Sequence, residues 1–161
     1  MITILSFYKL KKIKKLKNLK TILFDKIDIL SIKGLIILSP EGINGTISGT
    51  PKSISVAKKY LLFVLNISKF DVQNITHSKF VPFLKAKIKI KSEVVPINEK
   101  YDFNKKIKKN YLTPFQWNKF LNKKNNKIID ARKPFEYEVG TFKNAINPNT
   151  KNFREFKNYL S

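Results

Sequence analysis

The sequence predicts an α/β protein in two parts, a βαββαβ unit followed by the beginning of a parallel α/β domain. Two short apolar, β-rich runs face each other across a turn within Gly34–Gly49, and helical patterns lie on both sides of this hairpin, as they do in a βαββαβ unit. Beyond Tyr101, strand and helix patterns alternate, which is the order of a parallel α/β domain. We therefore predict domains at residues 1–100 and 111–161, joined by a polar, lysine-rich linker at 101–110.

The prediction for the first part depends on the hairpin. Its first strand is expected at Leu35–Leu38, and its second strand is expected to begin at Thr46–Ser48. Asn44-Gly45 between them is the dipeptide that most readily supplies two positive-φ residues to a tight turn. We therefore expect Asn44 and Gly45 to serve the turn and not chemistry. The same stretch lacks the lysine of a phosphate-binding loop.

The elements on either side of the hairpin follow from propensity and spacing. Thr3–Tyr8 is β-branched and aromatic, which predicts a strand. A helix is expected across the lysine-rich Lys9–Lys20, and it should be firmest at Leu16–Ile29, where apolar residues keep helical spacing. Thr50-Pro51 has the N-cap and first-turn chemistry that begins a second helix.

The rest of the chain carries weaker signals. Alternation of isoleucine with lysine in Ala86–Lys91 predicts a strand with one buried face and one lysine face. No element is predicted for the polar stretch Asp71–Ser78. In the second part, Thr113-Pro114 should cap a helix, and Lys127–Ala131 should form a short buried strand.

Lysine dominates the charge of the chain. With 33 Lys and Arg against 11 Asp and Glu, the formal net charge is +22. Such a charge favours polyanionic partners, chiefly nucleic acid. An A+T-rich coding sequence would also produce a chain rich in lysine, asparagine and isoleucine, but surface lysines attract phosphate groups whatever their origin.

The candidates for phosphate contact lie in the lysine-rich segment before Leu16 and in the alternating strand. For the first group, the alternatives are a solvated helix face without a ligand and a helix that lies on a membrane surface. The candidates are Lys11, Lys12, Lys14, Lys15, Lys87, Lys89 and Lys91.

Residue types that are absent restrict the chemistry. The 161 residues include no cysteine, and therefore no thiolate nucleophile, thiolate metal site or disulfide. His77 has no second histidine beside it and is predicted to be a loop histidine without a catalytic role, so we expect no metal and no cofactor. Lysines break every apolar run well short of the roughly 20 residues that a membrane span needs, which predicts a cytoplasmic protein without one.

Four segments of the sequence carry a family resemblance through their order and spacing. They are SPEGINGTISG, PFLKAKIKIKSEVV, YLTPFQWNKFL and IIDARKPFEYEVGTFKNAINPNTKNFREF. With them the chain resembles the rhodanese-domain proteins known as tRNA uridine hydroxylases, from about Ile4 to Phe156 and most specifically at Glu41–Thr46 and Gly140–Ala145. The residues that match the family motif are Glu41, Gly42, Asn44, Gly45, Asp130, Arg132, Glu136 and Gly140.

This resemblance implies a ferredoxin-like (acylphosphatase-like) domain, followed by a rhodanese-like domain. It also implies tRNA as a partner and, for the full-length enzymes, 5-hydroxylation of the wobble uridine with molecular oxygen as co-substrate. The reactive cysteine of the family lies in a Cys-Thr-Gly-Gly-Ile-Arg-Cys loop that would fall beyond Ser161, and no residue of this sequence replaces it. We therefore expect no catalytic residue within the chain.

The chain is thus predicted to be C-terminally truncated, holding the first domain and the opening of the second. It would be a truncated or decayed gene product, or a fragment completed by a second polypeptide that supplies the missing half. The alternative function is a non-catalytic basic RNA-binding module, and a weaker one is a basic peripheral membrane protein. Half a rhodanese sheet would leave several apolar side chains incompletely covered, namely Phe135, Phe142, Ile146, Phe153, Phe156 and Leu160.

Overall fold

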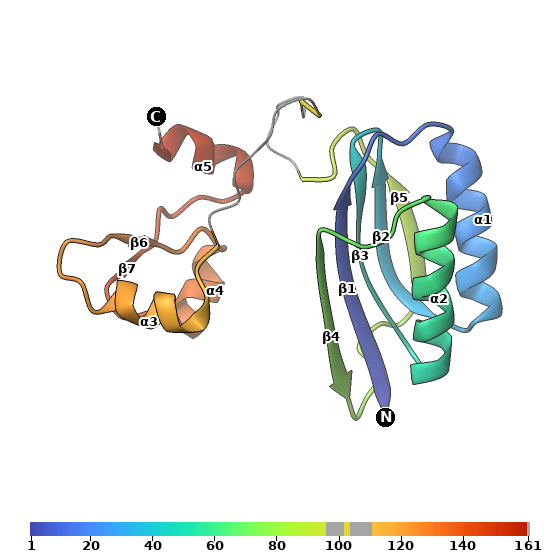
Figure 1. Ribbon diagram of the computed structural model, residues 1–161, viewed down its shortest axis with the longest axis horizontal. Coiled ribbons are helices and arrows are strands. Elements are labelled where there is room, and N and C mark those ends of the chain that lie inside the picture. Colours follow the sequence, from blue (N-terminus) through green and yellow to red (C-terminus); the bar gives the residue numbers. More distant parts are fainter. Residues whose placement is uncertain (96–101, 104–110, 161) are drawn as a thin grey trace. The chain divides into compact units, whose positions relative to one another are not determined.

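A computed structural model describes residues 1–95, 102–103 and 111–160, which belong to two compact units, Met1–Val95 and Pro96–Ser161 (Figure 1). Tyr101, where the domain boundary was predicted, lies outside the described residues. So does the predicted linker at 101–110, except for Asp102 and Phe103. The predicted domain limits therefore stay a prediction, and each unit is described by itself.

The first unit is a mixed sheet covered by helices on one face (Figure 1). The five strands have the order β4-β1-β3-β2-β5; β5 is parallel to β2 and the other neighbours are antiparallel. This is the predicted βαββαβ unit with one strand added at an edge. Its elements are β1 (Ile2–Leu10), α1 (Leu16–Ile29), β2 (Lys33–Ser39), β3 (Gly42–Gly49), α2 (Pro51–Val64), β4 (Val72–Ser78) and β5 (Ala86–Ile90).

The core lies between the sheet and the two helices. Strand residues that alternate along the chain point to this side, while the apolar residues of α1 and α2 recur at helical spacing. Each layer therefore contributes side chains that are at most 1% exposed, among them Leu5, Leu23, Ile36, Ile47 and Leu61. Thr50 caps α2 as predicted, because its side chain accepts a hydrogen bond from the Ser53 N–H.

The turn of the central hairpin lies at Pro40-Glu41, so the turn predicted at Asn44-Gly45 is wrong. Asn44 and Gly45 lie inside β3, where they pair with Ile37 and Ile36. Proline cannot donate to a sheet ladder and has a fixed φ, which suits the turn position. Gly45 is needed for another reason, since a Cβ there would lie 2.7 Å from Cζ of the buried Phe7 ring on the neighbouring strand.

Two other differences from the prediction concern the start of the first helix and the polar stretch before β5. The first helix begins at Leu16 and not at Lys9, because β1 continues to Leu10. The polar stretch Asp71–Ser78 forms the edge strand β4, which was not predicted. His77 therefore lies on a strand and not in a loop, and its Nδ1 is 3.3 Å from Thr3 Oγ1.

The second unit has the predicted alternation of helices and parallel strands. Thr113 forms a capping box with Gln116 at the start of its first helix, as the Thr-Pro signal indicated. The two short strands pair in parallel, with Ile128 opposite Ala145 and Ile129 opposite Ile146. The elements are α3 (Pro114–Leu121), β6 (Ile128–Ile129), α4 (Pro134–Val139), β7 (Ala145–Ile146) and α5 (Phe153–Leu160).

Apolar side chains of the second unit are incompletely covered, as expected. Phe156 is an exception because it is half-buried. The others are between 40% and 61% exposed, namely Phe135, Phe142, Ile146, Phe153 and Leu160. Along the described residues, no helix is both long and apolar enough to span a membrane.

Candidate nucleic-acid interface

The Pro40-Glu41 turn holds the lysine-rich loop between β1 and α1. The Lys11 N–H donates to the Glu41 carbonyl at 3.0 Å, and the Ile13 N–H donates to the Pro40 carbonyl at 2.9 Å. The loop therefore follows the turn, at the end of the sheet where β1 and β2 stop. We call the loop Lys11–Lys15, together with Lys91, the basic end of the sheet.

The same turn also holds the segment that follows β5. Glu41 Oε1 accepts a hydrogen bond from the Val94 N–H at 2.7 Å, and the Lys91 N–H donates to the Leu38 carbonyl at 2.9 Å. Two lysine-bearing segments that are far apart in the sequence thus meet at one turn. Sequence reasoning placed Glu41 in a motif but did not predict that its carboxylate holds the segment after β5. The partner is the backbone N–H of Val94, and an apolar residue gives no sign in the sequence of such a contact.

The lysines of the loop have different surroundings. Lys11 Nζ donates to the carbonyls of Leu65 and Asn66, where helix α2 ends, and so fixes the loop to that helix. Lys12, Lys14 and Lys15 are exposed. Helix α1 begins beside them with neither a side-chain cap nor an acidic residue in its first turn.

A pocket of about 310 Å³ lies among the loop, the start of α1 and the end of α2. The free N–H groups and positive dipole end of α1 favour an anion at this place, and so do the lysines of the lining. Lys11, Lys12, Lys14 and Lys15 belong to the lining, with Asn18 and Leu65 among the others.

The lysines of β5 lie apart from the loop. Lys87 pairs in register with Leu35, and Lys89 pairs with Ile37, while Ile88 between them is buried in the core. Lys87 and Lys89 therefore occupy the face of the sheet that α1 and α2 do not cover (Figure 1). Of the nominated strand lysines, the structure brings only Lys91 to the turn.

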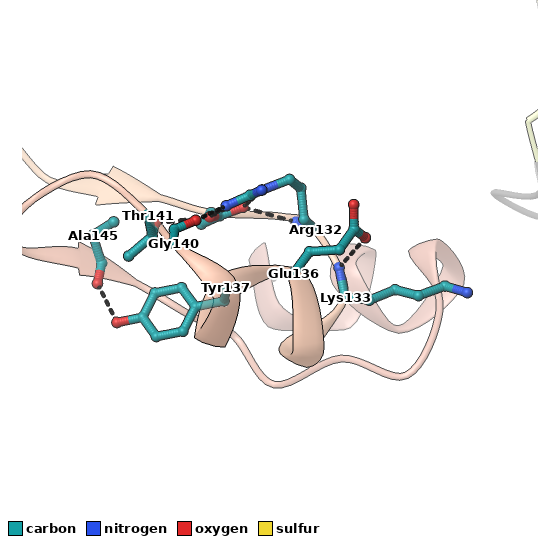
Figure 2. A network of polar contacts seen from close by, with 8 residues as sticks. Arg132, Lys133, Glu136, Tyr137, Gly140, Thr141 and Ala145 are labelled. Atoms are coloured by element: carbon teal, nitrogen blue, oxygen red, sulfur yellow. Dashed lines mark hydrogen bonds and ion pairs between the residues drawn. The ribbon is translucent and has the colours of Figure 1, made fainter. Parts of the chain in front are cut away.

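In the second unit, the motif residues Asp130, Arg132 and Gly140 form a polar network together with Thr141. Figure 2 shows how Arg132, Gly140 and Thr141 lie in it. Arg132 Nε lies 2.9 and 3.1 Å from the two carboxylate oxygens, and its Nη2 donates both to that carboxylate and to the Gly140 carbonyl. The Thr141 hydroxyl donates to the same carboxylate at 2.8 Å. The network thus ties the end of β6 to the segment after α4.

Glu136 acts within this unit as a helix cap. Its carboxylate accepts a hydrogen bond from the Lys133 N–H at the start of α4 (Figure 2). The next residue, Tyr137, ties the same helix to β7, because its hydroxyl donates to the Ala145 carbonyl at 3.0 Å. Beside the network lies a pocket of about 560 Å³, lined mainly by apolar groups that include Trp117 and Phe142. The four motif residues here, Asp130, Arg132, Glu136 and Gly140, support the local fold.

The Arg132 guanidinium, with the Thr141 hydroxyl, holds the pKa of the Asp130 carboxyl well below its ordinary value of 3.8. Such a carboxylate is a poor general base near neutral pH. Because the folded-state pKa is depressed, the stability that the ionised group contributes is present above the unfolded pKa, and it is lost only as the pH falls through the folded-state pKa.

We expect the Asp130 carboxyl to stay ionised at about pH 3, where an ordinary aspartic acid is mostly protonated. An NMR titration of its Cγ resonance measures this directly. In the Arg132→Lys variant the midpoint should move up towards 3.8, because lysine cannot form the same two-pronged contact. A midpoint near 3.8 in the unaltered chain would contradict the network.

Sequence comparison relates the first unit to a known family of domains and the whole chain to named relatives. Residues 2–94 match the family model described as UPF0176 acylphosphatase like domain. A tRNA uridine(34) hydroxylase of Pelagibacter ubique (strain HTCC1062) is 45% identical over 161 residues, which cover 100% of this chain and 53% of that protein. The tRNA uridine(34) hydroxylase of Legionella pneumophila (strain Corby) is 37% identical over 162 residues, covering 99% of this chain and 62% of that protein.

The chain therefore spans between about half and two thirds of the length of these relatives. Among solved structures, the acylphosphatase from Bacillus subtilis overlaps 56% of this chain and 98% of its own, with a TM-score of 0.40 and 10% sequence identity.

The βαββαβ sheet with its added parallel edge strand, together with the family match at residues 2–94, makes the first unit an acylphosphatase-like domain. With the relatives that match along its whole length, the chain belongs to the tRNA uridine(34) hydroxylase family. The resemblance drawn from the SPEGINGT and GTFKNA segments is confirmed.

Proposed function

We propose that this chain carries the tRNA-binding part of a cytoplasmic, oxygen-dependent enzyme that hydroxylates the wobble uridine. In this proposal, residues 1–100 form the acylphosphatase-like domain that binds RNA, and residues 111–161 begin a rhodanese-like domain. The names of the matching relatives support tRNA as the substrate class. The chain would bind tRNA chiefly through its phosphates, since lysines without a base-reading partner do not select sequence.

The observation that carries this proposal is the basic end of the sheet. Glu41 and the turn around it place the loop lysines and Lys91 at one site, although these residues are far apart in the sequence. Three lysines of that loop, Lys12, Lys14 and Lys15, are exposed next to an uncapped helix start. Cations and free N–H groups at one place suit phosphate oxygens.

We expect the chain to bind tRNA with a strong dependence on salt. A surface that contacts about 5 phosphates should give a slope of roughly −3.5 to −4.5 in a plot of log affinity against log salt concentration. Replacing Lys12, Lys14 and Lys15 together by alanine should make the slope less steep by about 2 to 3, since each lost phosphate contact contributes about 0.7 to 0.9. Filter binding across a salt series measures both slopes.

The matched control is alanine replacement of three exposed lysines outside the basic end, Lys33, Lys52 and Lys59. It removes the same charge but should leave the slope nearly unchanged. If both triple variants lose the same slope, binding follows net charge alone and the basic end is not the interface. A slope near zero, or stronger binding to anionic vesicles than to tRNA, would favour a membrane surface as the partner.

One observation favours a second candidate, a non-catalytic RNA-binding module. The sequence contains no cysteine, which is the residue type on which the family's reactive loop depends. Both candidates predict no hydroxylation by the chain alone, so the test fuses to it the part of the Pelagibacter relative that it does not match. Mass spectrometry of tRNA nucleosides after incubation with this fusion under oxygen separates the candidates. Hydroxylated uridine would exclude the module, and its absence with a folded fusion that binds tRNA would favour it.

A further inference from the structure

One face of the first unit's sheet is free of helices (Figure 1). This face carries polar and apolar side chains in rows. On β3 this face holds Asn44 and Thr46, and on β2 it holds Leu35 and Ile37, because these residues alternate with buried core residues. The register joins the rows, since Ile37 lies opposite Asn44 and Leu35 lies opposite Thr46.

A pocket of about 310 Å³ opens on this face. Its aromatic wall is Phe83, from the segment 79–85 that connects the two opposite edge strands, β4 and β5. The Lys85 carbonyl, which accepts a hydrogen bond from the Gly34 N–H at 3.1 Å, fixes the end of that segment. The described residues that line the pocket are Leu35, Ile37, Asn44, Gly45, Thr46 and Phe83.

The chemistry of the pocket suits a flat heterocycle with polar edges. Phe83 offers a ring, Asn44 offers an amide that can both donate and accept, and the Thr46 hydroxyl is held 3.0 Å from Ser6 Oγ. The pocket volume is at the lower end of the about 300–1,000 Å³ typical of small-ligand sites. No acidic side chain belongs to the described lining.

Cations border the pocket on one side. Lys87 and Lys89 stand on β5 next to Leu35 and Ile37, on the same face, and both are exposed. A phosphate that flanks a base in the pocket would therefore meet two lysines. An apolar peptide segment would offer no anion to these two lysines and no polar group to the Asn44 amide. Charge and hydrogen bonding therefore favour RNA as the ligand.

We propose that this pocket binds one unpaired nucleotide of RNA, with its base against Phe83 and Asn44 and its adjacent phosphates at Lys87 and Lys89. The proposal rests on the proposed tRNA binding and adds a site for a single-stranded base. Aromatic stacking with lysine contacts to the backbone is the general way in which proteins hold single strands. The basic end then supplies phosphate contacts, and the pocket adds preference for an unpaired base.

The test compares binding of an oligouridylate of about six nucleotides to the wild type and to Phe83→Leu. Leucine keeps an apolar side chain but removes the ring, so affinity should fall about 5- to 20-fold while the salt slope stays unchanged. Phe83→Tyr keeps the ring and should retain wild-type affinity. Phe63→Leu, which removes an exposed ring from helix α2, is the matched control and should bind like the wild type.

A cross-link provides a second measurement that needs no variant. A 4-thiouridine oligonucleotide irradiated with the wild-type chain should form adducts at residues 79–89 or 35–46. Adducts confined to residues 11–18, or wild-type affinity in a folded Phe83→Leu chain, would overturn the pocket while leaving tRNA binding at the basic end intact. Absence of salt-dependent tRNA binding by the wild type would instead overturn the proposed function itself.

Discussion

Gly42→Ala should destabilise the first unit by about 3 kcal/mol or more. A Cβ at this position would lie 2.2 Å from the Lys9 carbonyl oxygen and 3.2 Å from the Leu10 Cα on the neighbouring strand. Both are backbone atoms, so no side-chain rotation relieves the overlap, and the pairing of Leu10 with Gly42 must open. Denaturant unfolding followed by circular dichroism measures the loss, and hydrogen exchange in β1 and β3 locates it.

The second unit offers a matched control for this change. Gly140 has a φ of 163°, close to the 159° of Gly42, but a Cβ there would meet no atom within 4 Å. Gly140→Ala should therefore change stability by no more than about 0.5 kcal/mol. The comparison separates contact with a neighbouring strand from backbone conformation. Equal losses from both substitutions would show that the close approach of β1 to Gly42 is not what requires glycine.

The helices of the first unit were predictable because their signals are local. Apolar spacing gave Leu16–Ile29 for α1, and Thr50-Pro51 marked the start of α2, both as observed. Strand β4 carried no such signal. Both β4 and β5 are edge strands of the sheet, but no residue of β4 is buried, whereas β5 buries Ile88 in the core. Only β5 therefore needs an apolar residue in alternation with polar ones.

The hairpin shows where a local signal fails. Asn-Gly is a strong turn dipeptide, yet Gly45 is required by the Phe7 ring on a neighbouring strand, which no short window of sequence can reveal. A correct signal was present in Pro40, which cannot donate within a sheet. The Asn-Gly signal was therefore misleading because the glycine serves packing against Phe7 inside a strand and not a turn.

The candidate site was predictable in its residue types but not in its geometry. Charge alone nominated the lysines, and the motif nominated Glu41. That Glu41 binds the Val94 N–H depends on a contact across 53 residues. The pocket on the helix-free face of the sheet was not predicted. Phe83 and Asn44 come together there only because the segment 79–85 connects opposite edges of the sheet.

The second unit should exchange its amide hydrogens much faster than the first. Its strands β6 and β7 have two residues each, and the apolar side chains around them are exposed, whereas β2 and β3 are central in a five-stranded sheet. Amides that open without global unfolding lose protection first. Hydrogen exchange followed by mass spectrometry should show weak protection at Ile128 and Ile129 and strong protection at Ile36 and Ile47.

Additional strands beside β6 and β7 should reduce this difference in hydrogen-exchange protection between the two units. Fusing to the chain the part of the Pelagibacter relative that it does not match should raise protection at Ile128 and Ile129, because backbone groups of a short parallel pair gain partners and Phe142 gains cover. A fused polypeptide of equal length and unrelated sequence is the control and should have no such effect. Equal protection of both units before fusion, or no gain after it, would mean that the second unit is already complete as a folded body.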